Sequence, residues 1–176
     1  MANVSTVVVP VGDPDSFQDF ITARGGHLYR TACLLTGGDT HLAEDLVQET
    51  LGRMYVRWGR PSRLENPSGY AQTTLVNTFI SLRRKRSSSE RPAEITVESA
   101  ARGEDVPLRL TLLGALRQLS PQDRAVLVLR FWEDRSVEET AAALNLSSGA
   151  VRSRSSRALE RMRGLLGETY AEIMER

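Results

Sequence analysis

Residues 144–163, which read LNLSSGAVRSRSSRALERMR, decide the fold of the C-terminal half of the chain. The stretch opens with the small residues Ser147, Ser148 and Gly149 and continues with five arginines against one acid, Glu160. Its inward-facing residues recur at the spacing of an α-helix. These residues are Val151, Ser155, Ala158, Leu159 and Met162. A helix with small residues at its start and arginines around them suits a surface that lies flat on an acidic partner.

A shorter helix is predicted just before this one. Ser136 and Glu139 match the capping-box pattern, so we expect a helix over 137–144 and a tight turn at 145–147. Two helices joined in this way form a helix-turn-helix, whose second helix enters the major groove of DNA. An ordinary amphipathic helix with a solvated arginine face is the alternative. The outer face would present small residues to base edges and arginines to phosphates or guanines: Gly149, Ser153, Ser156 and Arg157, flanked by Arg152 and Arg154.

Basic residues gather in two separated clusters, although the formal net charge is only +1. The run Arg-Arg-Lys-Arg occupies 83–86, and the five arginines of the helix at 152–163 form the other cluster. Acidic residues gather elsewhere, at 44–49, 94–105 and 133–139. Two basic patches on a nearly neutral chain predict two docking points on a polyanion. A solvated charged face would explain either patch taken alone.

Length and composition indicate a chain of one or two small domains. The 176 residues are 40% hydrophobic, and no apolar run approaches the ~20 residues that span a bilayer. Residues 1–15 lack the basic start of a signal peptide, so we expect no membrane insertion. The lone Cys33 favours a reducing, cytoplasmic location, and one cysteine with two histidines is too little for a zinc site. No P-loop, Gly-rich phosphate cradle or nucleophile–base set is found, so we expect neither enzyme activity nor a cofactor.

Apolar periodicity predicts helices throughout, and therefore an all-α fold of two small helical domains. The first helix would be capped by Asp15 and Gln18 and end near Thr36. The second would begin after Asp39, and the third would start with the Asn-Pro pair at 66–67. The predicted organisation is a flexible tail at 1–14, a helical domain at 15–87, a flexible acidic linker at 88–107, a helix-turn-helix domain at 108–168 and a tail at 169–176.

Three motifs support one family resemblance. Residues 119–163 read LSPQDRAVLVLRFWEDRSVEETAAALNLSSGAVRSRSSRALERMR, residues 42–58 read LAEDLVQETLGRMYVRW, and residues 66–86 read NPSGYAQTTLVNTFISLRRKR. The first resembles domain 4, and the other two resemble domain 2, of the bacterial RNA polymerase sigma-70 family, in its extracytoplasmic-function (ECF) group. The resemblance runs over about 15–165. The chain departs from the family with Tyr70 in place of Trp, Val76 in place of a common Arg and Ser81 in place of a common Asp.

The resemblance implies a sigma factor that binds core RNA polymerase and directs it to promoters. Such a factor recognises the −35 and −10 elements and promotes DNA melting for transcription initiation. The implied partners are the β′ clamp helices and β flap of core RNA polymerase, together with promoter DNA, and an anti-sigma protein is left open. From pattern alone, the acidic side of the second helix could also be a solvated face. The polymerase-binding candidates lie on that side: Glu44, Asp45, Gln48 and Glu49.

By the same resemblance, the third helix engages the −10 element and the helix at 148–157 reads the −35 element. The −10 candidates are Tyr70, Asn77, Arg83, Arg84, Lys85 and Arg86, of which Tyr70 could equally be a core residue. The −35 candidates are Ser148, Gly149, Arg152, Ser153, Arg154, Ser156 and Arg157. The linker would thread toward the polymerase active-site cleft or serve as a simple tether. A helix-turn-helix regulator that never docks on polymerase is the rival function, but it leaves the acidic face and the second basic cluster unexplained.

Overall fold

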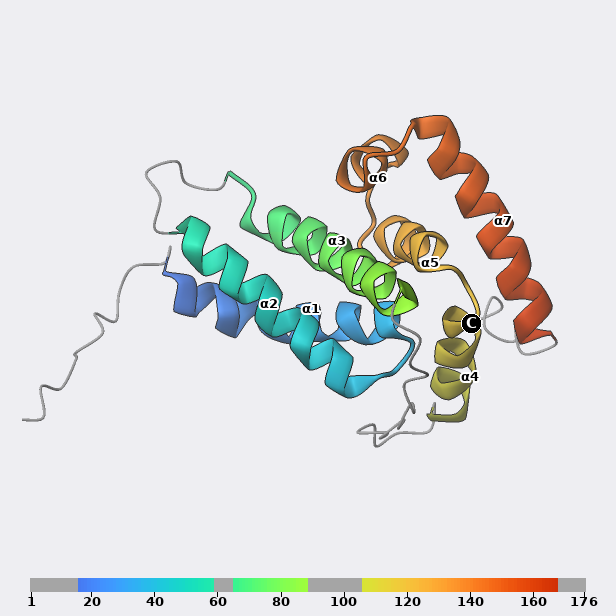
Figure 1. Cartoon of the computed structure of the whole chain (residues 1–176), viewed down its shortest axis with the longest axis horizontal. Helices are drawn as coiled ribbons and strands as arrows, with labels where there is room; N and C mark the ends of the chain where they lie inside the picture. The colour runs from blue at the N-terminus through green and yellow to red at the C-terminus, as the bar shows by residue number, and fades with distance from the viewer. Residues whose placement is uncertain (1–15, 59–64, 89–105, 168–176) are drawn as a thin grey trace, which may run out of the picture.

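The computed structural model describes residues 16–58, 65–88 and 106–167, and all regular structure within these ranges is helical (Figure 1). The predicted all-α fold is therefore confirmed for the described part of the chain. The predicted tails and nearly all of the predicted linker lie outside the described residues. The helices are α1 (Phe17–Thr36), α2 (Thr40–Trp58), α3 (Pro67–Ser88), α4 (Val106–Arg117), α5 (Pro121–Leu127), the π-helical η1 (Val128–Trp132), α6 (Val137–Leu144) and α7 (Ser148–Leu166).

Side-chain caps define where these helices begin. The Ser147 hydroxyl accepts a hydrogen bond from the Ala150 amide at 3.1 Å at the start of α7. The capping box predicted for α6 is present in full, with Ser136 and Glu139 each bonded to the other's backbone N–H. The predicted cap of the first helix was wrong. Ser16 caps α1, because its hydroxyl accepts from the Asp19 amide at 3.1 Å.

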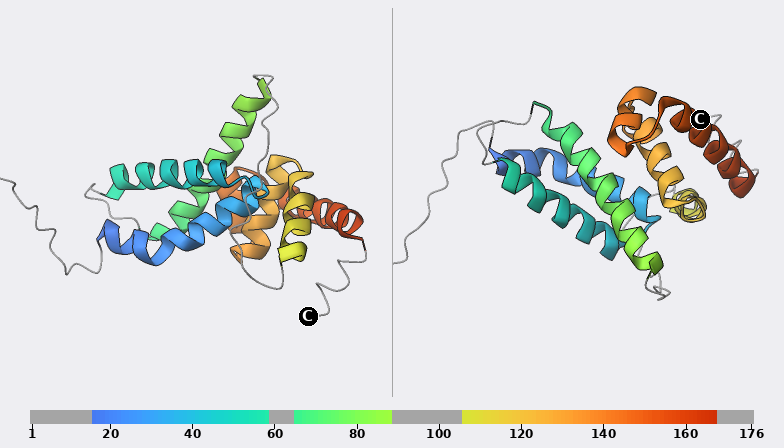
Figure 2. Two further views of the ribbon diagram at one scale, coloured as in Figure 1. Left: turned by 90° about the horizontal axis from the view of Figure 1, so that it is seen from below. Right: turned by 45° about the horizontal axis from the view of Figure 1, so that its top comes forward.

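The N-terminal unit consists of α1, α2 and α3. The first two helices pack side by side and α3 crosses them (Figure 2, left). Trp58 at the end of α2 packs against the rings of Phe17 and Phe20, with centroid separations of 5.3 and 5.5 Å. The turn between α1 and α2 is made possible by Gly37, whose φ of 65° is a left-handed conformation that favours glycine.

The C-terminal unit consists of α4 to α7 and contains the predicted helix-turn-helix. Asn145 ends α6 in a left-handed conformation with φ 53°, and the chain turns directly into α7. The inner face of α7 is buried at Val151, Ala158 and Met162, as the spacing predicted. Helix η1 continues α5 without a break. Helix α5 packs against α7, and η1 packs against α6 (Figure 1).

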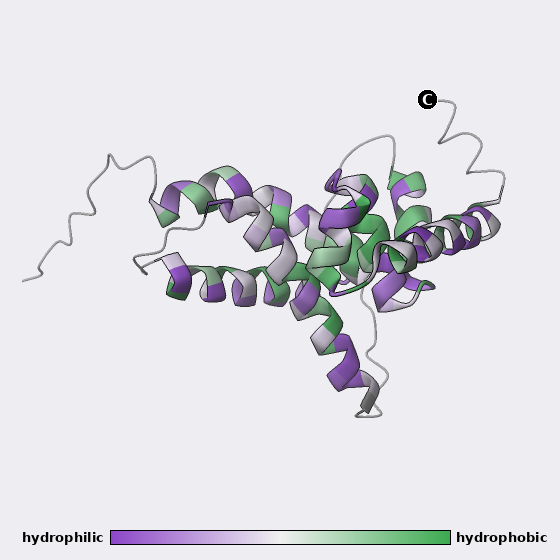
Figure 3. Cartoon of the chain, turned by 90° about the horizontal axis from the view of Figure 1, so that it is seen from above, coloured by the Kyte–Doolittle hydropathy of each residue, from purple (hydrophilic) through white to green (hydrophobic). Residues whose placement is uncertain are grey.

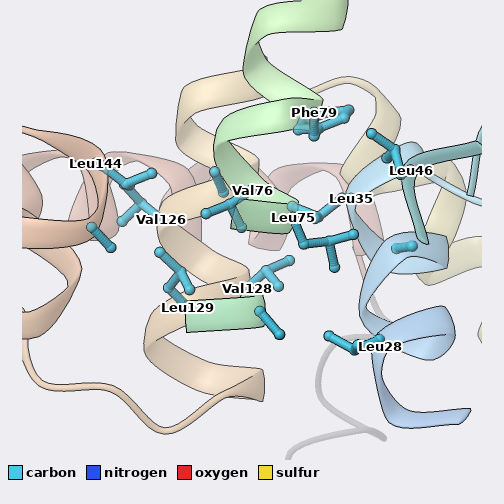
Figure 4. Close-up of a cluster of buried hydrophobic side chains, with 14 of the residues drawn as sticks. Leu28, Leu35, Leu46, Leu75, Val76, Phe79, Val126, Val128, Leu129 and Leu144 are labelled. Atoms are coloured by element: carbon cyan, nitrogen blue, oxygen red, sulfur yellow. The ribbon is translucent and has the colours of Figure 1, made fainter. Parts of the chain in front are cut away.

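The two units are packed against each other, which the sequence did not predict. One continuous cluster of buried side chains runs from α1 and α2 through α3 into α5, η1 and α6 (Figure 4). Helix α3 lies at the centre of this cluster, because it contacts α1 and α2 of its own unit and α5 and α6 of the C-terminal unit. The labelled members of the cluster are Leu28, Leu35, Leu46, Leu75, Val76, Phe79, Val126, Val128, Leu129 and Leu144. This cluster is therefore common to the two helical units, and a second, smaller cluster packs α4 and α5 against α7 within the C-terminal unit.

Candidate polymerase and nucleic-acid interface

Helix α2 separates a buried face from an acidic one. Leu42, Leu46 and Met54 are buried against the rest of the unit. The opposite face is exposed, and of its carboxylates Glu49 accepts an i,i+4 ion pair from Arg53 at 2.6 Å. An exposed pair of this kind contributes little to stability. The four polymerase-binding candidates, Glu44, Asp45, Gln48 and Glu49, are all exposed on this face.

The basic end of α3 projects away from the body of the molecule (Figure 2). The end of this projection is strongly hydrophilic (Figure 3). Arg84, Lys85 and Arg86 are exposed, and Arg83 is half-buried where the helix leaves the core. A run of cations on a projecting helix presents positive charge to a polyanion from several sides.

The other two −10 candidates lie further toward the start of α3 and already have intramolecular contacts. Tyr70 is half-buried, with the Arg57 guanidinium over its ring at 5.4 Å. The Asn77 amide donates a hydrogen bond to the Ala143 carbonyl in α6 at 2.9 Å. In this structure, therefore, the Asn77 donor is bound to the C-terminal unit.

The outer face of α7 is exposed where the helix-turn-helix reading expected it to be. Arg152 makes one long ion pair with Glu138, at 3.3 Å, and both side chains are exposed. Arg154 differs, because it is half-buried and pairs with Asp123 in α5 at 2.7 Å. Ser148 is also half-buried. The exposed candidates are Gly149, Arg152, Ser153, Ser156 and Arg157.

The two arginine surfaces meet in a single groove of about 720 Å³. Arg83 and Arg84 of α3 line one side, and Arg154 of α7 lines the other. Ser87, Ser120 and Gln122 add hydroxyl and amide groups to the lining, and Ile80 and Pro121 add apolar ones. The sequence placed these arginines in separate domains, whereas the structure brings them together.

A polar cluster that the sequence reasoning missed joins the two units. We call the side chains of Glu133 and Arg135 the clasp. The Glu133 side chain is only 2% exposed, and its carboxylate accepts from His27 at 2.9 Å, from Thr31 at 2.6 Å and from Gln72. A buried carboxylate with three donors has the partners that burial of a charge requires.

Arg135 supplies the other half of the clasp. Its guanidinium donates to the Gln72 side-chain oxygen at 2.8 and 3.0 Å, to the Thr73 hydroxyl at 2.9 Å and to the Gly69 carbonyl at 2.6 Å. Burial lowers the pKa of Arg135, and the carboxylates of Glu139 and Glu133 oppose that shift. Because an arginine pKa starts far above neutrality, Arg135 stays charged and holds three residues of α3 at once.

Comparisons with known proteins match both the N-terminal and the C-terminal unit. The family model for Sigma-70 region 2 matches residues 20–89, and that for Sigma-70, region 4 matches residues 115–164. The RNA polymerase sigma-E factor of Streptomyces coelicolor is 37% identical over 155 residues, which cover 87% of each chain. This chain belongs to the sigma-70 family. The ECF RNA polymerase sigma factor SigL of Mycobacterium tuberculosis is 32% identical over 154 residues, covering 80% of the sigma factor described here and 83% of its relative.

A solved structure resembles the whole arrangement. The sigma factor RpoE of Bartonella quintana, crystallised in complex with the anti-sigma factor NepR, matches with a TM-score of 0.72 and 28% identity. The match covers 89% of this sigma factor and 99% of that chain, so it extends over both helical units. The sequence, the fold and the relatives together identify an ECF RNA polymerase sigma factor, a class of initiation factors rather than enzymes.

The sequence pattern also gave no structural role to one buried arginine of this sigma factor. Arg124 is 2% exposed and donates to the Leu35 carbonyl at 2.6 Å, the Arg117 carbonyl at 2.9 Å and the Leu119 carbonyl at 3.1 Å. Burial, followed by the positive charges of Arg83 and Arg117, lowers its pKa to about 10. Arg124 is therefore still protonated at neutral pH and joins α5 to the end of α1. Its position in the sequence gave no signal of this role, because the carbonyl it reaches in α1 is 89 residues away.

No helix among the described residues is long and apolar enough to cross a membrane. Within the same part of the sigma factor, no group of three or more His, Cys, Asp or Glu side chains could hold a metal ion.

Proposed function

We propose that this sigma factor docks on core RNA polymerase through the acidic face of α2 and reads promoter DNA with α3 and α7. The observation that carries the proposal is the separation of charge on one small chain. Asp45 and Glu49 are exposed on α2, whereas the two basic surfaces belong to α3 and α7. The β′ clamp helices are the proposed binding site for this face, and the β flap is the proposed contact of the C-terminal unit.

The proposed −10 reader is α3. Arg84, Lys85 and Arg86 supply the charge that attracts a melted single strand, and Asn77 and Tyr70 supply polar and aromatic contacts to unpaired bases. Capture of extruded bases melts the duplex without nucleotide hydrolysis. The linker between the units stays a prediction, either threaded toward the polymerase active site or acting as a tether.

The proposed −35 reader is the exposed face of α7. Gly149, Ser153 and Ser156 leave room for the helix to approach base edges. Arg152 and Arg157 are long enough to reach guanines or phosphates from either side of that strip. Replacement of a base-reading arginine by alanine should weaken one base position selectively, whereas replacement of a phosphate-contacting arginine should weaken all sequences alike and lower the salt dependence.

The experiment that tests polymerase docking is run-off transcription with purified core polymerase on a promoter library. The wild type should give discrete transcripts, and the double charge reversal Asp45→Lys, Glu49→Lys should abolish them. A double variant that adds lysines elsewhere on the exposed surface, Gln18→Lys with Gln118→Lys, is the matched control and should transcribe normally. Equal transcription by the reversal and the control would refute the docking face.

We further propose an anti-sigma partner and a cytoplasmic site of action alongside polymerase. The support is the match to the Bartonella quintana sigma factor, which is in complex with an anti-sigma factor and resembles this chain across both units. Affinity purification of the tagged sigma factor from its host under non-inducing conditions should retain a stoichiometric protein that is not a polymerase subunit. Recovery of polymerase subunits alone would contradict this part of the proposal.

A further inference from the structure

We propose that the groove between α3, α5 and α7 binds a nucleoside di- or triphosphate in the free sigma factor. The phosphate chain would lie between Arg83 and Arg154, and the nucleoside would contact the apolar part of the lining. These two arginines are the basic candidates that the proposed promoter contacts leave unused. The inference therefore goes beyond the proposed function and does not depend on it.

The first support is the positive charge of the groove walls. Arg83 of α3 and Arg154 of α7 are half-buried where they line the groove, and Arg84 adds a third, exposed guanidinium. None of the described residues that line the groove is acidic. The charge of Arg83 also acts inward, because it follows burial among the causes that lower the pKa of Arg124. Clustered cations of this kind create a local positive potential that favours an anion.

The second support is the set of hydrogen-bond donors. A guanidinium donates through a planar fork that matches two phosphate oxygens at once. The Ser87 and Ser120 hydroxyls and the Gln122 amide add neutral donors to the lining. The Ser120 oxygen accepts from the Asp123 amide at 3.1 Å, and this role leaves its own O–H able to donate. A chain of two or three phosphates offers more acceptor oxygens than a single phosphate, so it suits this set of donors better.

The third support is an ion pair at the edge of the groove. Asp123 of α5 accepts from Arg154 at 2.7 Å, and each of the two side chains is 29% exposed. The pair holds the Arg154 guanidinium against the start of α5, where Ser120 and Gln122 line the groove. The carboxylate also offsets part of the positive charge of Arg154. Removal of this carboxylate should therefore strengthen the binding of an anion.

The size of the groove favours a compact ligand over a DNA duplex. Its volume of about 720 Å³ lies within the range of roughly 300–1,000 Å³ that is usual for small-molecule sites. A protein–DNA interface instead covers about 1,000–2,500 Å² of protein surface. Ile80 and Pro121 give the lining an apolar part for a sugar or base. The exposed arginines proposed for the −35 element, Arg152 and Arg157, do not line the groove, so it is a separate site from that surface.

The test is calorimetric titration of the full-length protein, without polymerase or DNA, with ATP, tripolyphosphate and AMP as probes. Magnesium is left out and the ionic strength is held constant. ATP should bind at a single site and raise the melting temperature as its concentration rises, because it stabilises the folded chain. AMP should bind about tenfold or more weakly than ATP because it lacks the phosphate chain, and tripolyphosphate should bind more weakly because it lacks the nucleoside. No saturable binding of ATP, or equal affinity of ATP for the chain with either other probe, would overturn the proposal.

Matched substitutions test whether the groove is the binding site. Arg83→Gln and Arg154→Gln should each weaken ATP binding by about tenfold or more, because each removes a charged donor. Asp123→Asn should tighten ATP binding several-fold, a gain that a damaged fold could not produce. Arg109→Gln and Arg161→Gln make the same change at exposed positions outside the lining and should bind ATP as the wild type does. Equal weakening by all four arginine variants would refute the site, because the attraction would then belong to the whole surface.

A labelled DNA duplex of random sequence separates the groove from the DNA-reading surface. Arg157→Gln should weaken duplex binding at low salt in fluorescence anisotropy and leave ATP binding unchanged. If the duplex displaces ATP and Arg83→Gln weakens both ligands equally, the groove belongs to DNA and the proposal fails. The outcome is also independent of polymerase docking, which run-off transcription measures. A chain that transcribes normally but binds no ATP would refute the groove alone, and a chain that binds ATP but never transcribes would refute only the proposed function.

Discussion

Arg124→Met tests whether a single buried arginine joins the two units. The methionine side chain fills a similar volume but has no donor, so the carbonyls of Leu35, Arg117 and Leu119 lose their partner. Hydrogen bonds to a charged group are each worth about 1.5–3 kcal/mol, and part of this is offset because the charge no longer has to be buried. We therefore expect the free energy of unfolding to fall by about 3–5 kcal/mol.

The assay is urea unfolding followed by far-UV circular dichroism. Arg109→Met, at an exposed position in α4, is the control and should lie within about 0.5 kcal/mol of the wild type. The free energy of unfolding of Arg124→Lys should lie between the values of these two variants. A lysine keeps the charge, but its single ammonium group cannot reach all three carbonyls that the planar guanidinium contacts at once. A loss of less than about 1 kcal/mol for Arg124→Met would refute the reasoning, since the loss of a charged donor by three carbonyls would then cost almost nothing.

Three further predictions concern local features. Gly37→Ala should lower the melting temperature by several degrees, because an added Cβ would lie 2.0 Å from a side-chain carbon of α4 in a left-handed turn, and an unchanged thermal melt would contradict this. The pKa of Glu139 is lowered chiefly by the backbone hydrogen bond from Ser136, so its ionised form stabilises the fold above the ordinary pKa and this contribution disappears as pH falls through the native value. Glu139→Ala should accordingly lose less stability than the wild type between about pH 6 and about pH 3, as measured by urea midpoints. Asp123→Asn removes the partner of Arg154 and should tighten non-specific DNA binding several-fold at low salt in a fluorescence anisotropy titration, with no change in high salt.

Features set by neighbouring residues were the ones that the sequence could predict. The capping box of α6 depends on side chains three residues from their targets, and it is present. The exposed acidic face of α2 follows from helical periodicity alone. The one misplaced cap, Asp15 in place of Ser16, shows the ordinary uncertainty of a helix end where two capping residues stand side by side.

Contacts between the units could not be predicted in this way. Gln72, Glu133 and Arg135 are polar residues that a pattern assigns to solvent. Gln72 donates to Glu133, 61 positions away, and accepts from Arg135, 63 positions away. Arg124 looks like one more helical arginine until its surroundings are known. In each case the decisive information is which element lies opposite, and periodicity within one helix does not contain it.

Two adjacent residues of α3 show how packing against the C-terminal unit and the proposed DNA contact coexist in one helix. Val76 is fully buried in the core shared by the two units and lies between α3 and α5 (Figure 4). The sigma-70 resemblance places an arginine at this position in many relatives, and an arginine there would have to bury its charge or hold the units apart. The next residue, Asn77, points its amide at the C-terminal unit, where it forms one hydrogen bond that DNA could replace. Valine thus stabilises the packing between the units through burial of an apolar side chain, while asparagine contributes a single hydrogen bond to α6. Val76→Arg should therefore destabilise the packing of α3 against α5 far more than Asn77→Ala, because it would place a charge in an apolar core.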